Sequence, residues 1–83
     1  MKIRVRYFAS IREALGGGET LELAEPATVG AVRDALVARD AAHARALGRD
    51  RAVRAALDQV LCAEAAAVAE GAEVGFFPPV TGG

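Results

Sequence analysis

The chain has 83 residues, and 20 of its apolar residues are alanine, so it has room for a single small domain with a thin core. It carries 10 basic and 11 acidic residues, and this balance argues against a nucleic-acid-binding protein. No window reaches the length and apolarity of a membrane-spanning helix, and the N-terminus alternates where a signal peptide would be continuously apolar. A single cysteine excludes an internal disulfide, which is typical of a cytoplasmic protein. Together with the charge balance and the hydropathy, this predicts a cytoplasmic protein that binds neither nucleic acid nor a membrane.

The first predicted element is a strand. Apolar and charged residues alternate along residues 2–9, and this period of two is typical of a strand with one covered face. The covered side takes Ile3, Val5 and Tyr7. Phe8 has the parity of the charged side chains, so we expect its ring on the open face of the sheet.

A short helix and a second strand follow. Residues 10–15 predict a helical turn with Ser10 as its N-cap, and the glycines from Gly16 to Gly18 end it. This glycine run lacks the Gly-Lys-Ser/Thr of a phosphate-binding loop, so we interpret it as a flexible turn. Residues 20–24 alternate again and predict a strand paired with the first one.

The main helix is predicted to begin after Thr28, which is a suitable N-cap. Apolar residues then recur at spacings of three and four, namely Val29, Val32 and Leu36. The charged Arg33 is assigned to another face of this helix. Residues 41–47 either extend the helix or form a second one that ends at Gly48.

Three short strands are predicted in the second half of the chain. Residues 52–57 and 60–62 flank Asp58-Gln59, which stands where a tight hairpin turn is expected. Residues 63–69 are interpreted as either a helical turn or a loop, and residues 73–77 form the last strand. Strands on both sides of one main helix in so short a chain predict an α+β fold whose main helix covers one face of the sheet and leaves the other partly open.

Side chains suited to catalysis are scarce. His43 lies in a helical segment rich in alanine and arginine, and we interpret it as solvent-facing. Cys62 is interpreted as a small buried apolar residue, because no neighbouring base is evident that would lower its pKa. With no second cysteine or histidine near either residue, no metal site is expected.

The segment after the last strand is unusual. Pro78 and Pro79 lack backbone donors and favour an extended conformation, so they end the sheet and direct the following residues away from the body. We therefore predict a folded domain over residues 1–77 and an extended C-terminal tail over residues 78–83.

The last two residues of the tail, Gly82 and Gly83, have no Cβ, so a terminal carboxylate fits through a narrow channel. A carboxylate is a poor electrophile and has to be activated, for instance as an acyl-adenylate, before a nucleophile attacks it. The chain has no nucleotide-binding motif for this step. The tail therefore predicts a terminal carboxyl group that another enzyme activates.

Three segments together resemble the MoaD family of sulfur carriers, the small subunits of molybdopterin synthase. They are the ending Phe76-Phe-Pro-Pro-Val-Thr-Gly-Gly83, the opening VRYFASIRE of residues 5–13, and Ala55-Ala-Leu-Asp-Gln59. The resemblance covers the whole chain and implies a ubiquitin-like β-grasp fold with a mixed sheet. Two positions depart from the family pattern: Asp58 replaces the usual Asn in the hairpin, and Ala72 replaces the usual Asp in a turn.

The resemblance also implies a chemical role for Gly83. It implies that an ATP-dependent, E1-like enzyme of the MoeB type adenylates Gly83 and that the adenylate becomes a thiocarboxylate. The sulfur is then passed, in a large subunit of the MoaE type, to cyclic pyranopterin monophosphate during molybdopterin (molybdenum cofactor) biosynthesis. The chain would be a sulfur donor and no enzyme on its own. It would bind no cofactor itself, and the activating enzyme would use the ATP.

Partner-contact residues are implied in the same way. Phe8, Leu61 and Phe77 match the family's apolar contact positions. The segment threaded into the large subunit would be Pro78, Pro79, Val80, Thr81 and Gly82. Three alternatives stay open: a sulfur carrier of another pathway, such as the ThiS type serving thiazole synthesis, a ubiquitin-like protein modifier, and a binding module with an inert tail. The sequence Phe-Phe-Pro-Pro-Val-Thr favours the molybdopterin branch.

Overall fold

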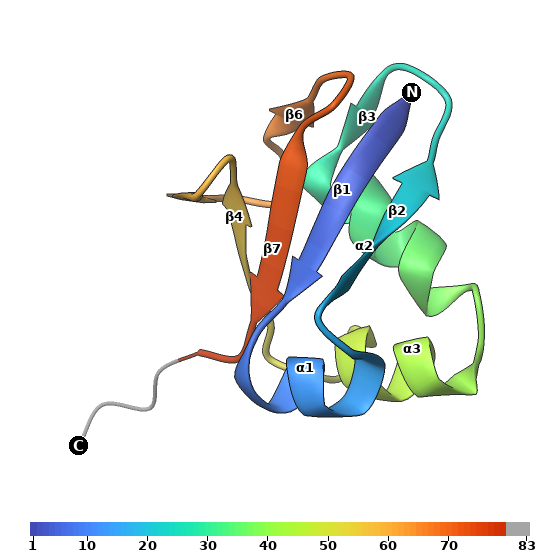
Figure 1. Ribbon diagram of the computed structural model, residues 1–83, viewed down its shortest axis with the longest axis vertical. Helices are drawn as coiled ribbons and strands as arrows, with labels where there is room; N and C mark the ends of the chain where they lie inside the picture. Colours follow the sequence, from blue (N-terminus) through green and yellow to red (C-terminus); the bar gives the residue numbers. More distant parts are fainter. Residues whose placement is uncertain (80–83) are drawn as a thin grey trace.

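A five-stranded sheet organises the chain, and the computed structural model describes residues 1–79 (Figure 1). The elements in chain order are β1 (Lys2–Tyr7), α1 (Ala9–Leu15), β2 (Gly18–Glu22), β3 (Ala27–Thr28), α2 (Val29–Val37), α3 (Ala41–Leu47), β4 (Arg54–Leu57), β5 (Val60–Cys62), β6 (Ala67–Val68) and β7 (Glu73–Phe77). The strand order is β2-β1-β7-β4-β5, with β1 parallel to β7 and the other neighbours antiparallel. Strands β3 and β6 form a separate antiparallel pair. This mixed sheet with its helices confirms the α+β class and is the ubiquitin-like β-grasp fold.

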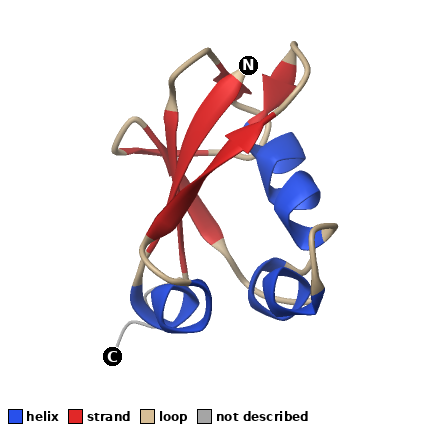
Figure 2. Ribbon diagram, turned by 45° about the vertical axis from the view of Figure 1, so that its right-hand side comes forward, coloured by secondary structure: helices blue, strands red, loops and turns tan. Residues whose placement is uncertain are grey.

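Alternation along β1 sorts its side chains onto two faces, as predicted. Ile3, Val5 and Tyr7 are buried, whereas the charged residues between them are exposed. Parallel pairing aligns Val5 with Val74 and Tyr7 with Phe76, so the buried Val74 and Phe76 of β7 lie on the same face. Helices α2 and α3 lie on one side of the sheet, and α1 lies at the end where β1 and β7 finish (Figure 2).

The main helix α2 begins as predicted. The Thr28 hydroxyl accepts a hydrogen bond from the backbone N–H of Ala31 at 3.1 Å, which satisfies a donor in the first turn. Its predicted apolar face is fully buried, at Val29, Val32 and Leu36. Helix α3 is separate from α2, because Asp40 forms a new N-cap and its carboxylate accepts the backbone N–H of His43 at 2.8 Å.

The start of α1 differs from the prediction. Its N-cap is Phe8 and not Ser10, and no side chain caps it. The backbone N–H of Phe8 donates to the carbonyl of Phe76 at 3.1 Å, so pairing with β7 continues to this residue and the chain turns at Ala9, where φ is 53°. The helix ends at Gly16, as predicted, with φ at 93°.

The hairpin between β4 and β5 is confirmed. Asp58 and Gln59 have φ values of 48° and 69°, and two positive values at the central residues are typical of the tight type I′ turn. The stretch 63–69, interpreted as a helical turn or a loop, instead contains the short strand β6, which pairs with β3 ahead of α2.

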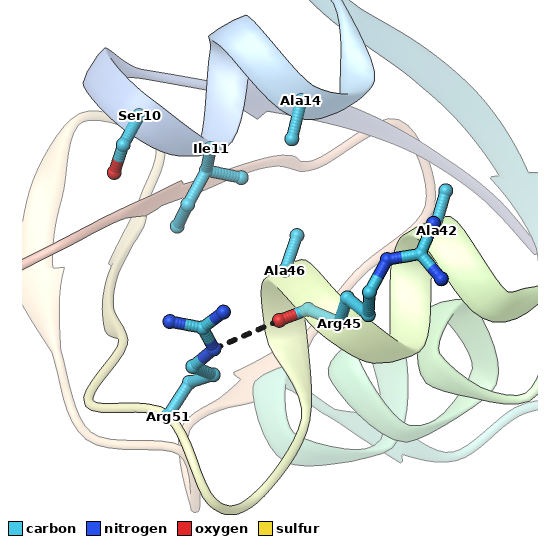
Figure 3. Close-up of a pocket in the computed structure, with 7 residues that line it drawn as sticks. All are labelled: Ser10, Ile11, Ala14, Ala42, Arg45, Ala46 and Arg51. Carbon is cyan, nitrogen blue, oxygen red and sulfur yellow. Dashed lines mark hydrogen bonds between the residues drawn. The ribbon is translucent and has the colours of Figure 1, made fainter.

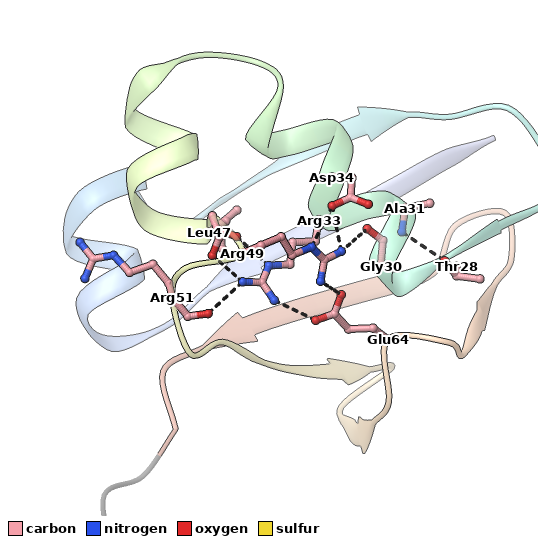
Figure 4. Close-up of polar contacts among 10 residues, drawn as sticks. Thr28, Gly30, Ala31, Arg33, Asp34, Leu47, Arg49, Arg51 and Glu64 are labelled. Atoms are coloured by element: carbon pink, nitrogen blue, oxygen red, sulfur yellow. Dashed lines mark hydrogen bonds and ion pairs between the residues drawn. The ribbon is translucent and has the colours of Figure 1, made fainter.

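Arg33 was assigned to a face of the main helix other than the apolar one, but it is also buried, with 4% exposure. Its Nε donates to the carbonyl of Leu47 at 2.6 Å and its Nη2 to the carbonyl of Gly48 at 2.7 Å (Figure 4). Its Nη1 forms an ion pair with the Glu64 carboxylate at 2.8 Å. The guanidinium therefore ties α2 to the end of α3 and to the segment before β6, and these partners offset the cost of burying its charge.

The last strand ends at Phe77, where the predicted body meets the predicted tail. Of the predicted tail, Pro78 and Pro79 are described, whereas Val80, Thr81, Gly82 and Gly83 lie outside the described residues. Within residues 1–79 no helix is long and apolar enough to cross a membrane.

Candidate functional site

A row of aligned residues crosses the sheet on the face opposite α2 and α3, which we call the outer face. Arg6 of β1 pairs with Gly75 of β7, Gly75 with Ala56 of β4, and Ala56 with Leu61 of β5. Paired positions point to the same side of a sheet, so these four residues share the outer face. The two central positions carry little or no side chain, which leaves a depression between the flanking strands.

Gly75 allows an aromatic ring to lie on this depression. A Cβ atom built at Gly75 would come within 3.0 Å of Cε2 of Phe8, so a larger residue would push the ring away. Glycine inside a strand often marks such a close approach. We predicted the strand but assigned no role to its glycine; an isolated glycine within an otherwise apolar strand was the signal available.

The outer face thereby forms an open groove with a volume of about 680 Å³, which we call the outer groove. It is lined by Arg6, Phe8, Ala9, Ala56, Gln59, Leu61, Glu73, Gly75, Phe77 and Pro78. The structure thus brings together the three apolar residues that the resemblance pointed to, and adds the first proline after β7. Pro79 is half-buried and does not line the groove.

The outer groove holds exposed apolar surface. Phe8 is 37% exposed and Leu61 is 58% exposed, and both line the groove, whereas Val60 of β5 is exposed without lining it. These three are the large exposed apolar side chains among residues 1–79. Clustered apolar surface of this kind is typical of a binding site on a small protein.

Charged side chains border the outer groove. The Arg6 guanidinium lies over the Phe8 ring, 5.3 Å from its centroid, in a cation–π contact. Arg4 forms an ion pair with Glu73 at 3.6 Å farther along the same face. An apolar floor with a mixed-charge rim suits a protein surface of the same composition.

The prediction that His43 faces solvent is wrong, because the residue is 9% exposed. Its Nε2 lies 2.7 Å from the Glu19 carboxylate and its Nδ1 lies 2.7 Å from the Asp40 carboxylate. Burial of the ring opposes protonation, but hydrogen bonds with these two carboxylates outweigh it and raise the pKa of His43. Glu19 also accepts the hydroxyl of the buried Tyr7, so His43 belongs to a polar cluster that supports the fold.

Cys62 is half-buried against the core, in line with its interpretation as a small apolar residue. Burial raises the pKa of its thiol, which disfavours the reactive thiolate. Among residues 1–79 no group of three or more His, Cys, Asp or Glu side chains is arranged to hold a metal ion.

Comparison with known sequences finds relatives along nearly the whole chain. Residues 5–83 match the ThiS family. The chain is 41% identical over 81 residues to the molybdopterin synthase sulfur carrier subunit of Escherichia coli strain K12, covering 98% of this chain and 99% of that protein. It is 38% identical over 82 residues to the protein of the same name from Haemophilus influenzae, with coverage of 98% and 99%.

Solved structures with the same fold include a small archaeal modifier protein 1 from H. volcanii, with a TM-score of 0.77 and 28% identity. That match covers 95% of this chain and 98% of that one. A subunit in the complex of subunits 1 and 2 of molybdopterin-converting factor from Helicobacter pylori 26695 matches with a TM-score of 0.70 over 100% of both chains. Its identity is 23%, so this likeness concerns the fold.

Proposed function

The chain belongs to the ThiS family, and we propose that within this family it is the sulfur carrier subunit of a molybdopterin synthase. The two homologues with that name each match 98% of this chain, so the proposal applies to the whole chain. The chain acts as a donor subunit, and the catalytic side chains belong to its partners.

The observation that carries this proposal is the position of the outer groove. Pro78 lines the groove and is also the first residue after β7, so the groove reaches the first residue of the predicted tail. A partner that covers Phe8, Leu61 and Phe77 is thereby in place to receive the residues that follow. Both prolines lack a backbone N–H and cannot extend the ladder of β7.

The chemistry takes place at the terminal carboxyl group of Gly83. Its carboxylate attacks the α-phosphate of ATP on an E1-like enzyme of the MoeB type, which forms a glycyl-adenylate and releases pyrophosphate. A donor of sulfide-level sulfur then attacks the glycyl carbonyl carbon, so that a C–S bond forms, AMP leaves and a thiocarboxylate results. In a large subunit of the MoaE type, the sulfur passes to cyclic pyranopterin monophosphate in the cytoplasm. The absence of a Cβ at Gly82 and Gly83 lets this end enter a narrow active site.

The outer groove supplies the binding energy that holds the carrier during transfer. Exposed aromatic and aliphatic side chains such as Phe8 and Leu61 are the anchors that interfaces bury at their centres. The H. pylori protein of the same fold was solved as a complex of subunits 1 and 2, which supports a large subunit as the partner of this chain.

A ubiquitin-like protein modifier is the second candidate. One observation favours it: a protein of similar structure and 28% identity is named a small archaeal modifier. A modifier would use the same adenylate but would pass the Gly83 carbonyl to an amine, forming an amide bond with another protein.

Intact mass spectrometry separates these functions. The chain is incubated with the activating enzyme, ATP and a sulfur donor. A carrier gains the mass that corresponds to replacing one oxygen atom by sulfur, whereas a modifier appears as covalent adducts with other proteins. An unchanged mass, with an activating enzyme shown to be active on another carrier, contradicts both.

A further inference from the structure

A second hollow lies between α1 and α3 and has a volume of about 460 Å³ (Figure 3). We call it the helix groove. Its apolar walls come from both helices and consist of Ile11, Ala14, Ala42 and Ala46. Three of these four side chains are single methyl groups, so an incoming chain can approach the two helices closely.

The polar border of the helix groove is cationic. It consists of Ser10, Arg45 of α3 and Arg51 of the segment before β4, with no carboxylate. Nε of Arg51 donates to the carbonyl of Arg45 at 3.0 Å, which holds the Arg51 side chain beside the groove (Figure 3). Within residues 1–79 neither guanidinium forms an ion pair, whereas Arg33, Arg39 and Arg49 all do.

This local charge contrasts with the chain as a whole, which has more acidic than basic residues. Two uncompensated arginines beside an apolar floor attract carboxylates that come with apolar neighbours. Charge complementarity therefore points to an acidic protein segment as the occupant.

The helix groove adjoins the outer groove. Ala9 lines the outer groove and the next residue, Ser10, lines the helix groove, so the first turn of α1 is the wall between them. The outer groove extends along β7 from Glu73 to Phe77 and Pro78, and α1, which lines the helix groove, lies at the end of the sheet where β7 finishes (Figure 1). A partner seated on the outer groove reaches the helix groove by crossing a single helical turn.

We propose that the helix groove binds an acidic segment of the large subunit, whose carboxylates pair with Arg45 and Arg51. The inference rests on the proposed function, since it assumes that partner. Solvent-exposed ion pairs contribute little to affinity, but they steer association and make its rate depend on salt. The expected signature is therefore an effect on the association rate constant, largest at low ionic strength.

The test measures association of the full chain with the large subunit by stopped-flow fluorescence at several salt concentrations. Arg45→Glu is the informative variant, because the Arg45 side chain forms no hydrogen bond within the described residues, whereas the Arg51 side chain donates one to the carbonyl of Arg45. Lys2→Glu, at the opposite end of β1, is the matched control with the same change of net charge. Arg45→Gln, which removes the charge without reversing it, guards against a misfolded Glu variant.

At low salt we expect Arg45→Glu to slow association about tenfold, Arg45→Gln by a smaller factor and Lys2→Glu less than about twofold. The differences should shrink as salt is added. If Arg45→Glu and Lys2→Glu behave alike while the unmodified chain binds, the helix groove proposal is overturned and the carrier function is untouched. If the unmodified chain does not bind the large subunit, both are overturned.

Discussion

Both faces of the sheet carry aromatic side chains, but these side chains are buried on one face and line a groove on the other. On the inner face, Tyr7 and Phe76 are fully buried beneath the helices, whereas their sequence neighbours Phe8 and Phe77 border the outer groove. Strand geometry causes this division, because successive side chains point to opposite faces. One aromatic residue of each pair therefore stabilises the fold, and the other is available to a partner.

The largest expected effect lies in the tail, which belongs to neither face. Adding one residue after Gly83 moves the carboxyl group away from the position where it is activated, so we expect sulfur transfer to be abolished. The melting temperature should be unchanged. Glu25→Gln, at an exposed position outside the tail, is the control and should retain transfer. Appreciable transfer by the extended chain would rule out the terminal-carboxyl mechanism.

Substitutions at two adjacent residues test whether the two faces contribute differently to stability. Phe76→Ala removes a fully buried ring and should lower the free energy of unfolding by about 3–5 kcal/mol. Phe77→Ala removes a half-buried ring at the groove and should cost less than about 2 kcal/mol. Urea denaturation measures both, and equal losses would show that the two faces contribute alike to stability.

Binding should respond in the opposite way. Phe8→Asp places a charge in the apolar groove, so we expect affinity for the large subunit to fall by about 2 kcal/mol or more, roughly 30-fold. Its stability should change by less than about 1 kcal/mol, since the ring is already partly exposed. Thr20→Asp, which adds the same charge on the outer face of β2, is the control. Unchanged affinity of Phe8→Asp in a titration would remove Phe8 from the interface.

The smallest expected effect is a pH dependence from the inner side of the molecule. The pKa of His43 is raised in the folded chain, so its contribution to stability is complete below about pH 6.5 and is lost as pH rises through the folded pKa. The pKa values of Glu19 and Asp40 are lowered, so their contribution is lost as pH falls below about 4.5. Stability should therefore be greatest between these limits.

The variant His43→Gln tests whether His43 causes the loss of stability as pH rises. Because glutamine does not titrate, the decline in unfolding free energy between pH 6 and pH 8 should be much smaller in the variant than in the unmodified chain. The measurement is urea denaturation at the two pH values. A decline of equal size in both proteins would assign the pH dependence to other groups.

Local patterns in the sequence predicted the elements that local physics controls. The alternation of β1, the cap at Thr28 and the turn at Asp58-Gln59 depend on residues close together in the chain, and the structure confirms each of them. The same alternation placed Phe8 on the open face, where it is found.

Distant contacts explain the predictions that were wrong. Arg33 and His43 look like surface residues because their carboxylate partners, Glu64 and Glu19, are 31 and 24 residues away. Ser10 does not cap α1, because pairing of Phe8 with β7 moves the start of the helix.

The outer groove could be predicted only in part from the sequence. The resemblance identified Phe8, Leu61 and Phe77, but their common site arises from the register of four strands. The vacancy at Gly75 that accommodates the Phe8 ring is visible only once these strands are paired.

As a sulfur carrier, the chain would hold a sulfur atom on Gly83 and give it up to a substrate bound by the large subunit. The most direct test starts from the thiocarboxylate form and adds the large subunit and cyclic pyranopterin monophosphate, with the intact mass of the chain followed over time. We expect the chain to return to its original mass as a dithiolene product forms, and we expect the sulfur to stay in place when the substrate is omitted. A thiocarboxylate that persists in the complete mixture, with a large subunit shown to bind the chain, would contradict this role.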